Sequence, residues 1–186
     1  TKIQAVLSGS LNFIFNNFNS DSSFYEVVKQ AGIEGYTEPD PRIDLSGVDV
    51  MRKILILARE SGTRLELNDI RNNSFLPKAS LDAKSVPDFM ETLKTEAAHF
   101  NEIQNKAAKN NCRLKFVAEF DNGSANVGLQ EIPSNHPFYN LDGSDNIVLF
   151  FTERYSKQPL IIKGAGAGAD VTASGLFADI IRIGNN

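Results

Sequence analysis

GYTEPDPRIDLSGVDVMRKILILARESG, residues 35–62, is the stretch around which this sequence is organised. Seven charged side chains fall within 16 residues, 38–53, directly before an apolar run: Glu38, Asp40, Arg42, Asp44, Asp49, Arg52 and Lys53. Pro39 and Pro41 disfavour the α conformation in the residues before them, so the segment from Thr37 to Pro41 is expected to be stiff and extended. Charges fixed in place beside apolar sequence favour a binding or catalytic site over a merely solvated surface.

The apolar run after these charges predicts a helix. Asp44 or Ser46 can cap a helix that begins near Gly47, because a short side chain with an oxygen satisfies the free amides of the first turn. Gly62 is suited to end it. Apolar residues occupy most of its circumference, which predicts a buried helix; they are Val50, Met51, Ile54, Leu55, Ile56, Leu57 and Ala58.

Asp49 and Lys53 are one turn apart on this helix, so their side chains project side by side. On spacing alone, an ion pair on the helix is the commonest explanation for such residues. A lysine that shares a cleft with several carboxylates also suits a polar, zwitterionic ligand. Both interpretations stay open on the pattern itself.

These residues carry a resemblance to a known family. GYTEPDPR at 35–42, DLSG at 44–47, DV at 49–50 and RK at 52–53 resemble the signature of homoserine dehydrogenases, with Ile43 as the visible departure. SGSLNFI at 8–14 is similar to the family segment that borders the substrate cleft, and GAGAGADVTASGLFADII at 164–181 resembles its closing segment. As bare patterns these two indicate only a tight turn before a helix and a glycine-rich turn that lacks the G-x-G-x-x-G spacing.

The resemblance implies an enzyme that interconverts L-homoserine and L-aspartate 4-semialdehyde with NADP or NAD, in the biosynthesis of threonine and methionine. Lys53 is the expected proton donor to the substrate oxygen. By their position in the signature, Glu38 and Asp49 bind the substrate ammonium group and Asp44 orients them. Gly35 and Gly168 are expected to let the cofactor approach the backbone closely.

The remaining sequence predicts an α+β fold. Strands are expected at 2–7, 113–120, 125–132, 147–152 and 160–163, with a short one within 65–75. Helices are expected at 11–18, 23–32 and 171–183, and a helical region at 85–110. DNGS at 121–124 predicts a hairpin, and Asp170 is a candidate cap for the last helix. Together they predict an open mixed or antiparallel sheet of about four or five strands covered by helices.

Residues 1–186 are expected to form one domain, the substrate-binding and catalytic portion of the enzyme, most like the end of a bifunctional aspartokinase/homoserine dehydrogenase. The family opens with a Rossmann nucleotide-binding domain that this sequence does not match, so most of the cofactor is expected to bind outside it. The fragment alone is therefore expected to be inactive. The family also pairs such sheets, which implies a homodimer. The rival hypothesis is a non-catalytic amino-acid-binding or dimerisation module that uses the same acidic cleft.

Composition excludes several other classes. A net charge of −4 without a basic cluster argues against a nucleic-acid partner. No apolar run is long enough to cross a membrane, and a single cysteine fits a reducing cytoplasm. The two histidines, His99 and His136, have no second ligand at metal-binding spacing, so no metal site is expected.

Overall fold

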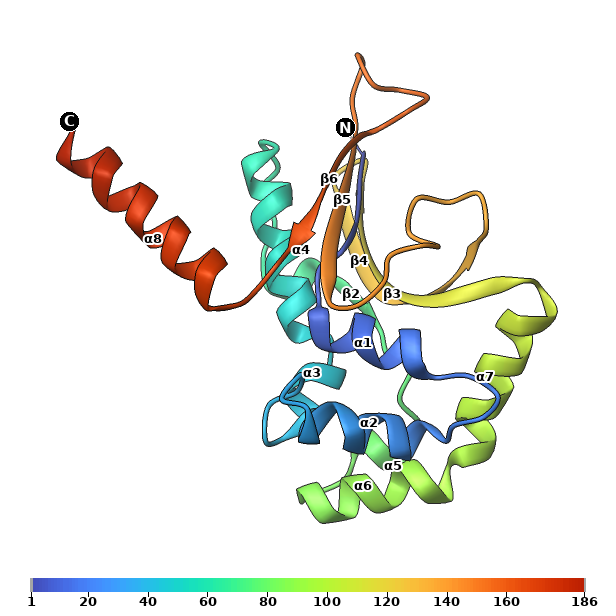
Figure 1. The fold of residues 1–186 in the computed structure, drawn as a ribbon. Helices are drawn as coiled ribbons and strands as arrows, with labels where there is room; N and C mark the ends of the chain where they lie inside the picture. The colour runs from blue at the N-terminus through green and yellow to red at the C-terminus, as the bar shows by residue number, and fades with distance from the viewer. Residues whose placement is uncertain (1, 186) are drawn as a thin grey trace.

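One six-stranded sheet runs through the protein, in the order β2-β4-β3-β1-β5-β6 (Figure 1). The structure is a computed structural model and describes residues 2–185. Neighbouring strands are antiparallel except β2 and β4, which pair in parallel. The predicted α+β class with an open mixed sheet is confirmed, although the sheet has six strands and not four or five.

The strands are β1 (Lys2–Val6), β2 (Arg71–Asn73), β3 (Cys112–Asp121), β4 (Ser124–Pro133), β5 (Asp145–Phe151) and β6 (Leu160–Ala165). The α-helices are α1 (Gly9–Asn17), α2 (Phe24–Ile33), α3 (Pro41–Leu45), α4 (Val48–Glu60), α5 (Lys78–Leu81), α6 (Val86–Thr95), α7 (Ala97–Lys109) and α8 (Ala169–Gly184), with one 3₁₀ turn at Leu67–Asp69. The short helices α3 and α5 were not predicted, because neither is long enough to show a periodic pattern.

Two hydrophobic clusters lie on opposite faces of the sheet. Helices α1, α4 and α7 pack against β3 on one face, around a large core that includes Ile3, Phe116 and Ala118. The other face carries a smaller cluster, which contains Val6 and Val117 and is covered by the connection between β4 and β5. Successive residues of β3 alternate between the two clusters, as the pleat of a strand requires.

Local sequence signals explain most element boundaries. Ser23 and Glu26 form the capping box of α2, and Ser8 caps α1 by accepting a hydrogen bond from the Leu11 N–H. Asn122 and Gly123 form the hairpin turn between β3 and β4 with φ angles of 47° and 80°, the left-handed geometry that a tight two-residue turn requires.

Three local predictions are wrong. Helix α4 is buried on one side only, and Ile56 is 60% exposed, because the sheet covers a single face of it. Its N-cap residue is Gly47 and neither Asp44 nor Ser46, although Ser46 Oγ does accept a hydrogen bond of 3.2 Å from the Val48 N–H at the start of α4. Asp44 lies within the short helix α3 and bonds to the Glu38 N–H instead. Gly168 likewise replaces Asp170 as the N-cap residue of α8.

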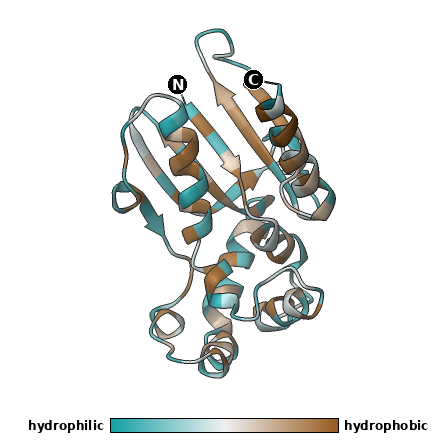
Figure 2. Cartoon of the chain, turned by 90° about the vertical axis from the view of Figure 1, so that its left-hand side faces the viewer, coloured by the Kyte–Doolittle hydropathy of each residue, from teal (hydrophilic) through white to brown (hydrophobic). Residues whose placement is uncertain are grey.

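The end of the chain is the most exposed part of the fold. Every residue of β6 and α8 is exposed, and α8 projects away from the sheet (Figure 1). Apolar side chains account for much of this surface; they are Leu160, Ile161, Ile162, Val171, Leu176, Phe177, Ile180, Ile181 and Ile183. Figure 2 shows the corresponding brown stretches along the C-terminal helix. Among residues 2–185, no helix combines the length and apolar character needed to cross a membrane.

Candidate active site

A pocket of about 560 Å³ lies where the β1–α1 turn, the segment before α3, the start of α4 and the segment between β6 and α8 meet. All six residues singled out in the sequence line it: Gly35, Glu38, Asp44, Asp49, Lys53 and Gly168. Chain positions more than 100 residues apart thus contribute to one cavity. The structure brings the predicted site together as a single place, whatever role each residue has.

Lys53 lines this pocket, and two contacts hold its ammonium group in place. Its Nζ donates to the backbone carbonyl of Leu7, at 2.9 Å, and lies 2.7 Å from Oδ2 of Asp49. An ammonium group has three donors, so one remains after these two contacts. The Lys53 and Asp49 side chains are 40% and 56% exposed, which shows that the pair is open to a ligand and not buried.

The ion pair predicted from spacing alone is therefore present, and the same two side chains also line the pocket. An exposed pair of this kind stabilises a helix by only about 0.3–0.5 kcal/mol. Helix stability alone therefore does not explain why both groups lie in the pocket. The Leu7 carbonyl ties Lys53 to the end of β1, which fixes the ammonium group relative to the sheet as well as to α4.

Asp44 orders the segment that carries Glu38. Its Oδ2 accepts a hydrogen bond of 2.9 Å from the backbone N–H of Glu38. Asp44 comes from α3, whereas Glu38 lies in the irregular chain before it. This contact closes a small loop across Pro39 and Pro41, so both carboxylates face the pocket from a chain with little conformational freedom.

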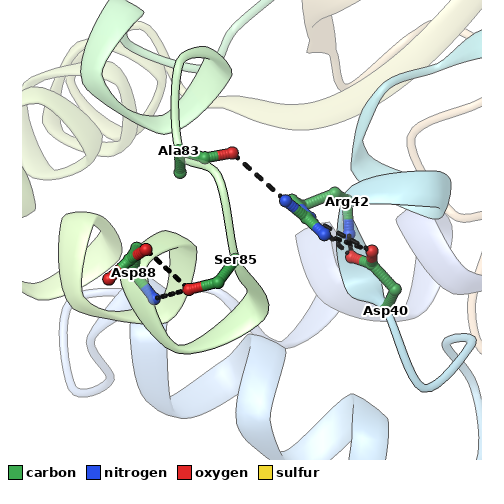
Figure 3. Close-up of polar contacts among 5 residues, drawn as sticks. All are labelled: Asp40, Arg42, Ala83, Ser85 and Asp88. Carbon is green, nitrogen blue, oxygen red and sulfur yellow. Dashed lines mark hydrogen bonds and ion pairs between the residues drawn. The ribbon is translucent and has the colours of Figure 1, made fainter.

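Arg42 anchors the same segment to the rest of the helical layer (Figure 3). Its guanidinium lies 2.6 Å from Oδ2 of Asp40 and donates to the carbonyl of Ala83 at 3.1 Å. Asp40 in turn caps α3 through the Arg42 N–H. The Arg42 guanidinium lowers the pKa of the Asp40 carboxyl below its usual value, chiefly through the hydrogen bond between the two side chains. Asp40 and Arg42 therefore stabilise the fold around α3, and neither lines the pocket.

The glycines that line the pocket differ in how much space lies beside their backbone. Gly35 and Gly168 have φ angles of 77° and 126°, and nothing lies within 4 Å of the position that a Cβ would take on either. Space beside the backbone of both residues is therefore open to a flat ring, which fits the expected approach of a nicotinamide. Gly166 is the crowded one, because a Cβ there would overlap the side-chain amide of Asn146.

Sequence reasoning missed part of the lining. Ser144 and Asn146 reach the pocket from the β4–β5 connection and the start of β5, and Tyr36 and Arg52 line it beside the predicted residues. Ser8, Gly9 and Ser10 line it as the resemblance implied. No local pattern marks Ser144 or Asn146, since only the pairing of β5 with β1 brings them near α1.

Comparisons with known proteins identify the family of this chain. A sequence model described as homoserine dehydrogenase matches residues 1–181. The chain is 46% identical over 184 residues to a maize protein named bifunctional aspartokinase/homoserine dehydrogenase 2, chloroplastic, covering 98% of this chain and 20% of the maize protein. It is 41% identical over 189 residues to the homoserine dehydrogenase of Saccharomyces cerevisiae, covering 98% of this chain and 52% of the yeast protein.

Solved structures share the fold of this chain. A Candida auris protein described as of unknown function superposes with a TM-score of 0.92 at 41% identity, over all of this chain and 53% of that one. A putative homoserine dehydrogenase from Archaeoglobus fulgidus, 22% identical over 98% of this chain and 50% of its own, shares the fold with a TM-score of 0.75. The chain thus spans about half the length of the yeast relative and a fifth of the maize one. By sequence and by fold, it belongs to the homoserine dehydrogenase family.

Proposed function

We propose that residues 1–186 act as the substrate-binding and catalytic domain of a homoserine dehydrogenase, which interconverts L-homoserine and L-aspartate 4-semialdehyde. The observation that carries this proposal is the convergence of Glu38, Asp44 and Asp49 beside Lys53 in one pocket. Each of these two substrates has an ammonium group, which carboxylates can bind, and an oxygen at the end of its side chain, which a proton donor can reach. This pocket presents both kinds of partner within one cavity.

The proposed roles follow from the contacts. The Glu38 and Asp49 carboxylates bind the substrate ammonium group, and Asp44 holds the Glu38 backbone in position. Lys53 directs its remaining N–H towards the substrate oxygen and donates the proton that this oxygen requires when the aldehyde is reduced. When bound, the reduced cofactor, NADPH or NADH, would supply the hydride to the aldehyde carbon, and the oxidised form would accept it in the reverse direction. Gly35 and Gly168 leave room for the ring beside the backbone.

The cofactor is proposed to bind mainly to a nucleotide-binding domain outside these residues, which agrees with the chain covering about half of its yeast relative. The single cysteine suits a reducing compartment, and we place the reaction in the cytoplasm, as a step towards threonine and methionine. The name of the maize relative places that protein in the chloroplast. The terms "full-length enzyme" and "complete enzyme" below mean these residues joined to such a domain.

Glu38→Gln in the full-length enzyme is expected to raise the KM for homoserine by roughly 10–100-fold, with a smaller effect on kcat. Glutamine keeps the shape but removes the charge that attracts the ammonium group, and a hydrogen bond to a charged partner contributes about 1.5–3 kcal/mol. Steady-state kinetics measure both constants. Glu34→Gln is the matched control, because Glu34 is exposed and lies outside the pocket. Equal KM values for the two variants would remove Glu38 from substrate binding.

Residues 1–186 alone are expected neither to bind NADPH measurably nor to oxidise homoserine. Gly35 and Gly168 offer only one edge of the cofactor site, whereas tight binding of a dinucleotide uses a phosphate-cradling turn and a ribose-binding carboxylate. Titration calorimetry with NADPH and an assay of homoserine oxidation test this. Turnover by the isolated chain would show that these residues are more than a dependent catalytic domain.

A homodimer is also part of the proposal. Strand β6 is an edge of the sheet, and Leu160, Ile161 and Ile162 on it are 46%, 46% and 58% exposed. Phe150, on the neighbouring strand β5, packs against the main core and does not add to this exposed edge. An exposed apolar edge strand is a template for pairing with a second chain. Light scattering at micromolar concentration is expected to give the mass of a dimer, and Ile162→Lys to weaken it; a monomeric mass for the unaltered protein would contradict the proposal.

A further inference from the structure

Lys115 is a fully buried lysine in the middle of β3 that has no part in the chemistry described above. Its Nζ donates to Oδ1 of Asn12 at 2.9 Å, to Oδ1 of Asn16 and to the carbonyl of Leu141. The three donors of an ammonium group thus meet three oxygen acceptors. Burial lowers the pKa of Lys115 to about 8, so the charged form still predominates at pH 7. A buried charge is costly unless it is fully bonded, as this one is.

The two asparagines that accept from Lys115 also bind the chain between β4 and β5. Asn12 Nδ2 donates to the carbonyl of Gly143 at 2.9 Å, and Asn16 Nδ2 donates to the carbonyls of Leu141 and Gly143 at 3.1 and 3.3 Å. Asn12 and Asn16 are one turn apart on α1, so both amides face the same way. Lys115, Asn12 and Asn16 together form what we call the lysine clamp, which joins β3, α1 and segment 141–145.

The clamp lies directly behind one wall of the active-site pocket. Segment 141–145 carries Ser144 and leads into Asn146, and both line the pocket. The N-terminus of α1 supplies Ser8, Gly9 and Ser10 to the same pocket. Ser144 packs closely on α1, because a Cβ on Gly9 would lie 3.1 Å from the Ser144 carbonyl oxygen. Whatever fixes segment 141–145 against α1 therefore fixes the shape of this wall.

We propose that Lys115 is a positioning residue for the substrate pocket: its buried ammonium group holds segment 141–145 on α1 and so sets the places of Ser144 and Asn146. This inference rests on the proposed function of the pocket. The alkyl chain of Lys115 fills space as a methionine would. Only its charge satisfies three oxygens at once, two of them on side chains whose own amides bind the segment.

The test uses Lys115→Met in the complete enzyme, with Lys109→Met as the control because Lys109 is exposed on α7. Methionine keeps the buried volume but leaves three acceptors without a donor. We expect the KM for homoserine to rise about tenfold with kcat changed less than about threefold, and the control to behave as the unaltered enzyme. Unchanged constants in a folded Lys115→Met enzyme, or a loss in kcat alone, would overturn the inference.

A double-mutant cycle separates positioning from general weakening of the fold. If Lys115 acts through the pocket wall, its effect on KM should shrink to less than about threefold in a background that carries both Ser144→Ala and Asn146→Ala, because the two groups that it positions are gone. Equal effects of Lys115→Met in both backgrounds would show a merely structural role. If Lys115→Met does not fold, Asn16→Ala decides the question: a raised KM supports the clamp, and an unchanged KM contradicts it.

A measurement that needs no activity keeps this inference separate from the proposed function. Hydrogen exchange of the amides in segment 141–146 is expected to be faster in Lys115→Met, with the amides of α6 unaffected. If the unaltered enzyme does not oxidise homoserine, the proposed function fails while the exchange result still tests the clamp. If the unaltered enzyme is active and exchange in segment 141–146 does not change, the clamp fails and the function stands.

Discussion

Replacing Lys53 by alanine in the full-length enzyme is expected to lower kcat for homoserine oxidation by about 10²–10⁴-fold, the usual contribution of a general acid or base. The Lys53 ammonium reaches the pocket from α4, is fixed by the Leu7 carbonyl and Asp49, and retains one donor for the substrate. The KM should change less, because the carboxylates bind the other end of the substrate. Lys109→Ala, on the exposed side of α7, serves as the control.

Lys53→Arg distinguishes proton transfer from charge. Arginine keeps the positive charge but does not release its proton in proteins. The arginine variant should therefore be nearly as slow as Lys53→Ala if Lys53 transfers a proton, and should recover most of the rate if Lys53 contributes charge alone. Near-normal turnover in Lys53→Ala would remove Lys53 from the mechanism.

The second large effect is expected from Gly47→Ala, measured as thermal stability. Gly47 has a φ of 73°, and an added Cβ would lie 2.6 Å from Cζ of Phe116, whose ring is buried in the main core. A left-handed non-glycine residue costs about 1–2 kcal/mol, and forcing extra volume into a packed core costs about 1–3 kcal/mol more. The melting temperature should fall by roughly 5–15 °C for a chain of this size.

Gly62→Ala is the control for the stability experiment. Gly62 also has a positive φ, 87°, but nothing lies within 4 Å of its added Cβ. Only the backbone strain then remains, and the loss should be about 1 kcal/mol. Equal shifts in melting temperature for the two variants would show that the contact with Phe116 adds nothing, contrary to the packing seen here.

Much of the site could be predicted from sequence because its main part is local. Glu38, Asp44, Asp49 and Lys53 fall within 16 residues, and a rigid proline segment followed by a helix confines them to one region. The strands at 113–120 and 125–132 could be predicted equally well, since the turn at Asn122 and Gly123 sets their register.

Contacts between distant segments could not be predicted in this way. Lys115 alternates with apolar residues in β3, a pattern that favours an exposed lysine. It is buried because Asn12, Asn16 and Leu141 surround it, and these come from parts of the chain about 100 and 26 positions away. The contributions of Ser144 and Asn146 to the pocket have the same origin, since sheet topology and not local pattern places them.

Helix α8 has a practical consequence for anyone who surveys variants of this protein. All of its residues are exposed, so most substitutions along it, proline apart, are expected to change the folding free energy by no more than about 0.5 kcal/mol. Gly168, immediately before α8, nevertheless lines the pocket. A screen that ranks variants by yield or melting point would therefore pass changes at this end of the chain as neutral. Only an assay of turnover would reveal which of them have disabled the enzyme.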